Sequence, residues 1–144
     1  MKKPLQMLVL GALGLLALPR IADGCDCVRV PPPVQFGPRD VVFVGRVLES
    51  KPLEYVEIEA LETFHGRIDR RVRIPTGQSD CDYFLPPVVT KRGTQFLVYG
   101  IIRDDGTLVV NRCSGSGPLN RKTREVERLR QRAQRRPKQQ RDRH

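Results

Sequence analysis

The sequence is poor in the residues that build metal centres and nucleophilic active sites. Its two histidines, His65 and His144, lie far apart and have no second metal ligand at helical spacing. Structural zinc sites favour Cys-x2–4-Cys pairs, whereas one residue separates Cys25 from Cys27. No Ser/His/Asp or Cys/His set is apparent. We therefore expect no bound metal, no cofactor and no catalysis, and we interpret His65 as a residue at the end of a strand.

Long hydrophobic runs are also missing. The apolar stretch at residues 5–18 is shorter than the roughly 20 residues that a membrane-spanning helix needs. Lys2 and Lys3 precede it, and Ala22-Asp23-Gly24 follows, with small residues at the −3 and −1 positions of a cleavage site. This pattern predicts a secretory signal peptide over residues 1–24, cleavage after Gly24, and a mature chain that begins at Cys25 in the periplasm or outside the cell.

Two alternatives to this N-terminus stay open. The apolar segment could be retained as an anchor, although its length argues against that. Lipoprotein processing would also make Cys25 the first residue and would attach a lipid to it. Lipoprotein signals usually carry Leu near −3 and a small uncharged residue at −2, where this chain has Ala22 and Asp23.

The few cysteines indicate disulfides. Their number is even, and the chain is predicted to enter an oxidising compartment, which is typical of a disulfide framework. Four cysteines allow three connectivities, of which a bridge between Cys25 and Cys27 fits least well because it closes a very tight ring. Each long-range bridge would add about 3–4 kcal/mol of stability by restricting the unfolded chain. The cysteines concerned are Cys25, Cys27, Cys81 and Cys113.

Charge is unevenly distributed along the chain. Residues 25–119 contain twelve Lys/Arg and twelve Asp/Glu, so this stretch is neutral. Residues 120–144 contain eleven Lys/Arg and three Asp/Glu, a net charge of +8. Val126, Leu129 and Ala133 recur at helical spacing, which predicts a helix over about 120–134. We expect a basic tail that is helical at first and disordered beyond Pro137.

Five short strands are predicted between the cysteines. The first is mostly apolar, as in a buried strand, and the second and third alternate in the manner of half-exposed strands, which places Glu57 and Glu59 on a solvated outer face. Gly45 inside the first strand predicts a bulge or a tight bend, and Asp104-Asp105-Gly106 predicts a hairpin turn. The pattern favours a small β-barrel or sandwich, with strands at residues 40–48, 56–60, 71–74, 95–102 and 108–110.

Several segments, taken in order, resemble the tissue inhibitors of metalloproteinases and their netrin-like relatives. Cys25-Asp26-Cys27, followed by the proline-containing stretch 30–34, resembles their mature N-terminus. The resemblance covers residues 25 to about 119. It also rests on five further segments. Residues 42–47 are similar to the first barrel strand of bacterial members, residues 62–66 to a strand-ending aromatic-x-Gly segment, and residues 79–81 to the loop of the third cysteine. Residues 96–99 are similar to a YLVYA strand, and residues 112–114 to the segment of the last cysteine.

This resemblance implies a mainly β fold over residues 25–119, namely a five-stranded barrel of the oligonucleotide/oligosaccharide-binding (OB) type. The C-terminal helix and basic tail, residues 120–144, follow this barrel. It also implies the disulfides Cys25–Cys81 and Cys27–Cys113. In the animal inhibitors, the N-terminus and the loop of the third cysteine form a wedge that enters a protease cleft. The matching residues of this chain are Cys25, Asp26, Cys27, Val28, Ser79, Asp80 and Cys81.

The wedge would act through a zinc ion of the target protease. A catalytic zinc keeps one coordination position open for water or substrate. The neutral α-amine of Cys25 and the adjacent carbonyl oxygen would chelate that zinc and displace its water. This chain differs from the animal inhibitors, which carry Thr or Ser at the second position, by having Asp26 there. It also lacks their third disulfide and their C-terminal domain.

Three functions are compatible with these patterns. The first is a secreted metalloprotease inhibitor acting through Cys25. The second is a non-inhibitory netrin-like module that binds an envelope or extracellular protein. The third gives the main role to the basic tail, residues 120–144, which would bind an anionic polymer or lipid headgroups. Nucleic acid is a poor candidate because the barrel is neutral and the chain is exported. We expect a monomer.

Overall fold

The computed structural model describes residues 25, 27, 36–84 and 91–141, with side chains of the last helix up to residue 135. The predicted signal peptide, the proline-containing stretch 30–34, Asp26 and Val28 lie outside these residues. The elements, in chain order, are β1 (Asp40–Lys51), β2 (Tyr55–His65), β3 (Arg71–Pro75), β4 (Gln95–Ile102), β5 (Leu108–Val109), a one-turn 3-10 helix η1 (Arg112–Ser114), β6 (Gly117–Pro118) and α1 (Leu119–Arg141).

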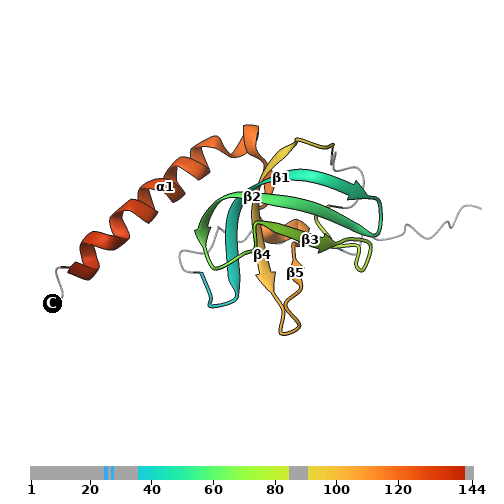
Figure 1. Ribbon diagram of the computed structural model, residues 1–144, viewed down its shortest axis with the longest axis horizontal. Coiled ribbons are helices and arrows are strands. Elements are labelled where there is room, and N and C mark those ends of the chain that lie inside the picture. Colours follow the sequence, from blue (N-terminus) through green and yellow to red (C-terminus); the bar gives the residue numbers. More distant parts are fainter. Residues whose placement is uncertain (1–24, 26, 28–35, 85–90, 142–144) are drawn as a thin grey trace, which may run out of the picture.

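The strands form one antiparallel sheet in the order β3-β2-β1-β4-β5, and the short β6 pairs with β4. The two end strands, β3 and β5, approach within 8 Å between Cα atoms, so the sheet curls almost into a closed barrel (Figure 1). This confirms the predicted mainly β fold with five barrel strands and a C-terminal helix, and it is consistent with an OB-like barrel. The predicted hairpin turn is also present, since the amide of Gly106 donates to the carbonyl of Arg103 at 3.0 Å.

The curl of the sheet depends on irregularities in the pairing of β1 with β2. Val44 pairs with Glu62 but Gly45 pairs with Ala60, so Leu61 has no partner in β1 and forms a bulge. This confirms the prediction at Gly45, with the extra residue in the neighbouring strand. A Cβ atom at Gly45 would collide with the side chain of Ile58. Because bulges bend a strand and increase its twist, they let β1 and β2 wrap around the core.

Two apolar clusters lie on opposite faces of the sheet. The first fills the barrel interior and contains Val41, Phe43, Val47, Val56, Ile58, Ile74, Phe84, Phe96, Val98, Leu108 and Val110. The second lies on the outer face, where Val42, Val44, Leu97 and Tyr99 meet Val126 and Leu129 of α1. β1 and β4 are thus buried on both faces, which explains why residues 41–45 of β1 are all apolar rather than alternating.

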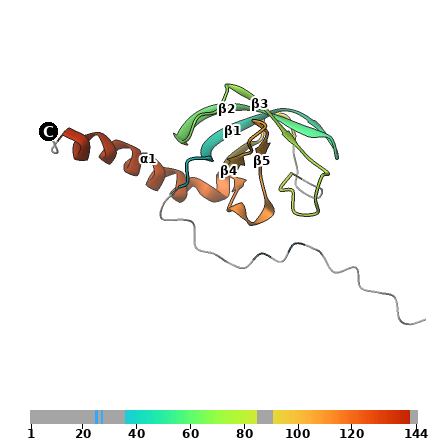
Figure 2. The ribbon, with the colours of Figure 1, turned by 90° about the horizontal axis from the view of Figure 1, so that it is seen from below.

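Helix α1 packs against the outer face of the sheet with its first turns and extends away from the barrel with its last ones (Figures 1 and 2). It is longer than predicted: it continues through Pro137 to Arg141, where we expected disorder. A proline in a helix removes one main-chain hydrogen bond. Its neighbours, among them Arg135 and Lys138, are good helix formers, and this favours continuation.

The acidic side chains on the outer face of β2 are less solvated than predicted. Glu59 is only 9% exposed and forms ion pairs with Arg46 at 2.6 Å and Arg70 at 3.2 Å. Glu57 pairs with Arg73 at 2.9 Å. The hydrogen bond from Arg46 lowers the pKa of Glu59 most, burial opposes this effect, and Arg70 adds to the lowering. The alternation placed both residues on the correct face, but the arginines of β1 and β3, and Arg70 just before β3, cover them.

Candidate functional site

Two disulfides attach the N-terminal segment to the barrel. They join Cys25 to Cys81 and Cys27 to Cys113, each with a Cα–Cα distance of 5.2 Å. This is the pairing that the resemblance implies. The Sγ atoms of Cys25 and Cys113 are 4.0 Å apart, so the two bridges lie side by side. Cys25 and Cys27 are therefore both joined covalently to the barrel, two residues apart in sequence.

The sulfur atoms form a compact group. Cys25, Cys27 and Cys113 place their Sγ atoms within 4.8 Å of one another, and within the described ranges no other set of three or more potential metal ligands comes together. All three are oxidised, and none of the cysteines is free. Because metals bind the thiolate, this group cannot serve as a ligand set while the disulfides are intact.

The loop before Cys81 is held by its own side chains. The carboxylate of Asp82 accepts hydrogen bonds from the amides of Gln78 (2.9 Å) and Ser79 (3.2 Å), and the hydroxyl of Ser79 accepts one from the amide of Cys81 (3.0 Å). Such short-range bonds are the usual way in which Asp and Ser stabilise turns. Asp82 is buried, whereas Ser79 and Asp80 are exposed. The loop therefore presents two polar residues to solvent from a fixed main chain.

The loops that carry Cys81 and Cys113 are paired with each other. The amide of Arg112 donates to the carbonyl of Cys81 at 2.8 Å, and Asp82 forms a β-bridge with Asn111. The side chain of Asn111 accepts from the amide of Cys113 at 2.7 Å and caps η1. Since the two loops are hydrogen-bonded to each other, both disulfides end on one platform, formed by the loops around Cys81 and Cys113.

Five of the seven predicted wedge residues fall within the described part of the chain. The structure brings Cys25 into contact with Cys81, directly after the exposed pair Ser79 and Asp80, and it places Cys27 at the neighbouring bridge.

His65 ends β2, as expected, and its Nε2 atom lies 3.1 Å from the carbonyl oxygen of Gly37.

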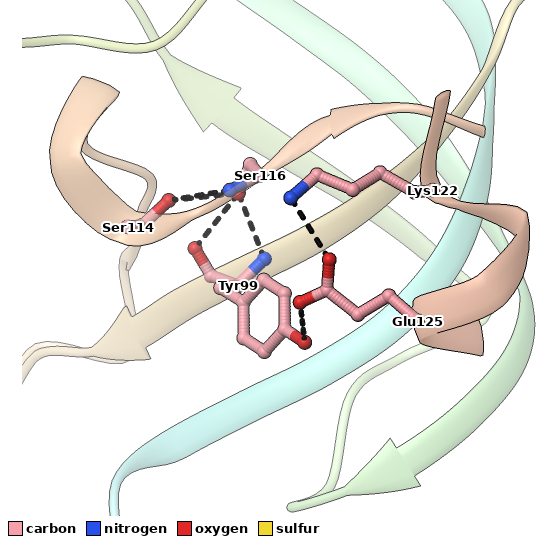
Figure 3. Close-up of polar contacts among 5 residues, drawn as sticks. All are labelled: Tyr99, Ser114, Ser116, Lys122 and Glu125. Atoms are coloured by element: carbon pink, nitrogen blue, oxygen red, sulfur yellow. Dashed lines mark hydrogen bonds and ion pairs between the residues drawn. The ribbon is translucent and has the colours of Figure 1, made fainter. Parts of the chain in front are cut away.

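A polar network that the sequence did not reveal joins α1 to β4 next to this platform (Figure 3). The hydroxyl of Tyr99 donates to Glu125 at 2.7 Å, and Lys122 donates to the other oxygen of the same carboxylate at 2.9 Å. The main chain of Tyr99 is satisfied by Ser116, whose hydroxyl accepts from its amide at 2.8 Å and donates to its carbonyl at 3.2 Å; Ser114 bonds to Ser116 at 2.8 Å.

The electrostatics of the network keep Glu125 ionised. Burial raises the pKa of the Tyr99 hydroxyl, and its hydrogen bond to Glu125 raises it further. Burial also acts to raise the pKa of Glu125, but the hydrogen bonds from Tyr99 and Lys122 outweigh this effect, and the net pKa is lowered. A signal was present in the sequence, because Tyr99 lies within the predicted strand at residues 95–102 and a buried tyrosine hydroxyl requires a partner.

No protein-family model matches the chain, and a search of the curated proteins finds no match. The family therefore remains a prediction from the cysteine pattern and the ordered segments.

Among the described residues, no helix combines the length and the apolar character needed to cross a membrane.

Proposed function

We propose that this chain is a secreted inhibitor of a zinc metalloendopeptidase, similar in mode of action to the tissue inhibitors of metalloproteinases. The observation that supports it best is the disulfide from Cys25 to Cys81, with a Cα–Cα distance of 5.2 Å. After cleavage behind Gly24, this bond would hold the new α-amine beside the exposed Ser79-Asp80 pair. The two disulfides are compatible with an extracytoplasmic location.

The inhibitory step would be chelation of the protease zinc by the amine nitrogen and the carbonyl oxygen of Cys25. An amine binds a metal only in its neutral form, and an α-amine titrates near pH 8 in model peptides. Fixing the amine before binding reduces the conformational entropy lost in the complex. The adjacent bridge from Cys27 to Cys113 contributes to this fixation, because it restrains the chain two residues further on.

Asp26 would determine the choice of target. Its side chain would point towards the specificity pocket of the protease, and an unpaired carboxylate buried there would cost several kcal/mol. A pocket with a basic residue would offset that cost. We therefore expect a protease with a basic specificity pocket to be inhibited more strongly than one with an apolar pocket.

The test begins with exported protein whose intact mass and non-reduced peptide map establish a start at Cys25 and the two bridges. Inhibition constants are then measured on a panel of zinc metalloendopeptidases. The matched control carries one additional alanine before Cys25, which converts the amine into an amide and leaves both disulfides in place. We expect this extension to weaken inhibition by about a hundredfold or more, equivalent to about 2.8 kcal/mol.

Two results would contradict the proposal. One is a mature chain that is lipidated at Cys25 or cut elsewhere, since it would have no free amine at that residue. The other is equal inhibition by the extended and the authentic chains. A partner protein that binds both forms equally well would instead indicate the non-inhibitory binding module.

A further inference from the structure

Helix α1 has a packed side and an exposed side of very different composition. Val126 and Leu129 are buried against the sheet, and Leu119 is half-buried. These residues and Ala133 are the apolar residues of the helix, which contains no aromatic residue at all. The apolar content of α1 is thus almost entirely used for attachment to the barrel.

Four exposed arginines form a row on another side of the helix. They follow one another at spacings of three, four and seven residues, which places them on one face. At 1.5 Å per residue the row is about 21 Å long. Arg132 lies between the last two and contacts the ring of Phe36 at 5.7 Å. We name this row the arginine stripe; it consists of Arg121, Arg124, Arg128 and Arg135.

The acidic residues of the helix are bonded to other residues, although the charge of Glu125 also acts on Arg128. Glu125 is bonded to Tyr99 and Lys122, and Glu127 lies 3.8 Å from Arg130. Arg130 itself is paired with Glu62 of β2 at 2.7 Å. Among the residues whose side chains are described, no carboxylate lies within 4.0 Å of any of the four stripe arginines. The stripe therefore presents a line of guanidinium groups to solvent.

We infer that the arginine stripe binds a linear anionic polysaccharide, one that carries carboxylates or sulfates along its length. Guanidinium groups bind such oxyanions through paired hydrogen bonds. A straight row of charges on a rigid helix matches a ligand whose charges also repeat along a line. The inference is independent of the inhibitor proposal, because it concerns α1 and not Cys25.

Two other polyanions fit the stripe less well. Helices that lie in a membrane interface insert an apolar face, and the apolar face of α1 is already packed on the barrel. Single-stranded nucleic acids are usually bound with aromatic side chains that stack on the bases, and α1 has none. The disulfides are compatible with an extracytoplasmic location, where a polysaccharide is the more accessible polyanion.

The test measures binding of the full chain to heparin and to polygalacturonate over a series of salt concentrations. The variant R121Q/R124Q/R128Q/R135Q removes the stripe. The charge-matched control R67Q/R71Q/K91Q/R92Q removes four exposed positive charges from the barrel. Circular dichroism establishes that both remain folded, as expected because glutamine and arginine have similar helix propensities.

We expect the stripe variant to bind at least one polysaccharide more than tenfold more weakly at physiological salt, with a salt slope smaller by about three. The control should change affinity less than threefold. Equal losses in the two variants would overturn the inference, because net charge alone would then explain binding. It would also be overturned if vesicles containing phosphatidylglycerol, or duplex DNA, bound the wild type more tightly than either polysaccharide and lost affinity in the stripe variant.

Discussion

The described N-terminal cysteines and the C-terminal helix are attached to the barrel by different means. Cys25 and Cys27 are attached by two covalent bonds that end on one pair of loops. Helix α1 is attached by a small apolar contact and a few polar bonds, centred on Leu129, Tyr99 and Glu125. The disulfide attachment should be weakened by reductant and hardly by pH. The helix attachment should instead be weakened by loss of the apolar contact and by protonation of Glu125. This difference makes each attachment separately testable.

The largest effect is expected from breaking a disulfide. Cys81→Ala should reduce the free energy of unfolding by about 4 kcal/mol, because the bridge to Cys25 closes a long loop in the unfolded chain. Cys25→Ala should have the same effect, and the double variant should cost no more than either single one. Urea denaturation of the three variants provides the measurement. Additive losses would mean that the two residues stabilise the protein separately.

An intermediate effect is expected from the apolar contact of the helix. Leu129→Ala leaves a cavity between α1 and the outer face of the sheet, and we expect a loss of about 3 kcal/mol in the free energy of unfolding. Arg124→Ala, an exposed position on the same helix, should change stability by less than about 0.5 kcal/mol. If the two variants denature alike, the helix does not depend on this contact.

The smallest effect is expected from Tyr99→Phe, which removes the hydrogen bond to Glu125. We expect a loss of about 1–2 kcal/mol at neutral pH. Since folding lowers the pKa of Glu125 from its usual value of 4.5, its contribution is present above that value and is lost as the pH falls through the lower, folded-state pKa. The difference between variant and wild type should therefore shrink below about pH 4.5, as followed by thermal denaturation across pH. A difference that stays constant would exclude the carboxylate as its origin.

The sequence predicted the strands well where one pattern persists and less well where the pattern breaks. Their mostly apolar character located β1 and β4, because both are buried on two faces. Alternation indicated only residues 56–60 of β2, since the bulge at Leu61 interrupts it after Ala60, and the later part of the strand was indicated only by the interpretation of His65 as a strand-ending residue. The pair Gly117 and Pro118 forms β6 through contacts with β4 that are not local in sequence, and no local pattern could reveal them.

The candidate site was predicted to a similar degree. The even number of cysteines and the predicted export indicated a disulfide framework, and only the resemblance implied which cysteines pair. The network around Glu125 was not predicted, because the helix position of this residue relative to Tyr99 depends on how α1 packs on the sheet. Pairwise contacts between distant elements follow from tertiary structure, which periodicity alone does not determine.

The incomplete closure of the barrel has a consequence for self-association. Among the residues that the structure describes, the edge strands β3 and β5 each have a side on which no strand of the sheet pairs, and such edges can recruit a strand from another molecule. β5 has only two residues, and β3 carries the exposed Arg71 and Arg73 and ends at Pro75. Short length, like charge and a proline all discourage edge-to-edge pairing. The two edge strands at the open side of the barrel, β3 and β5, are thereby protected against aggregation.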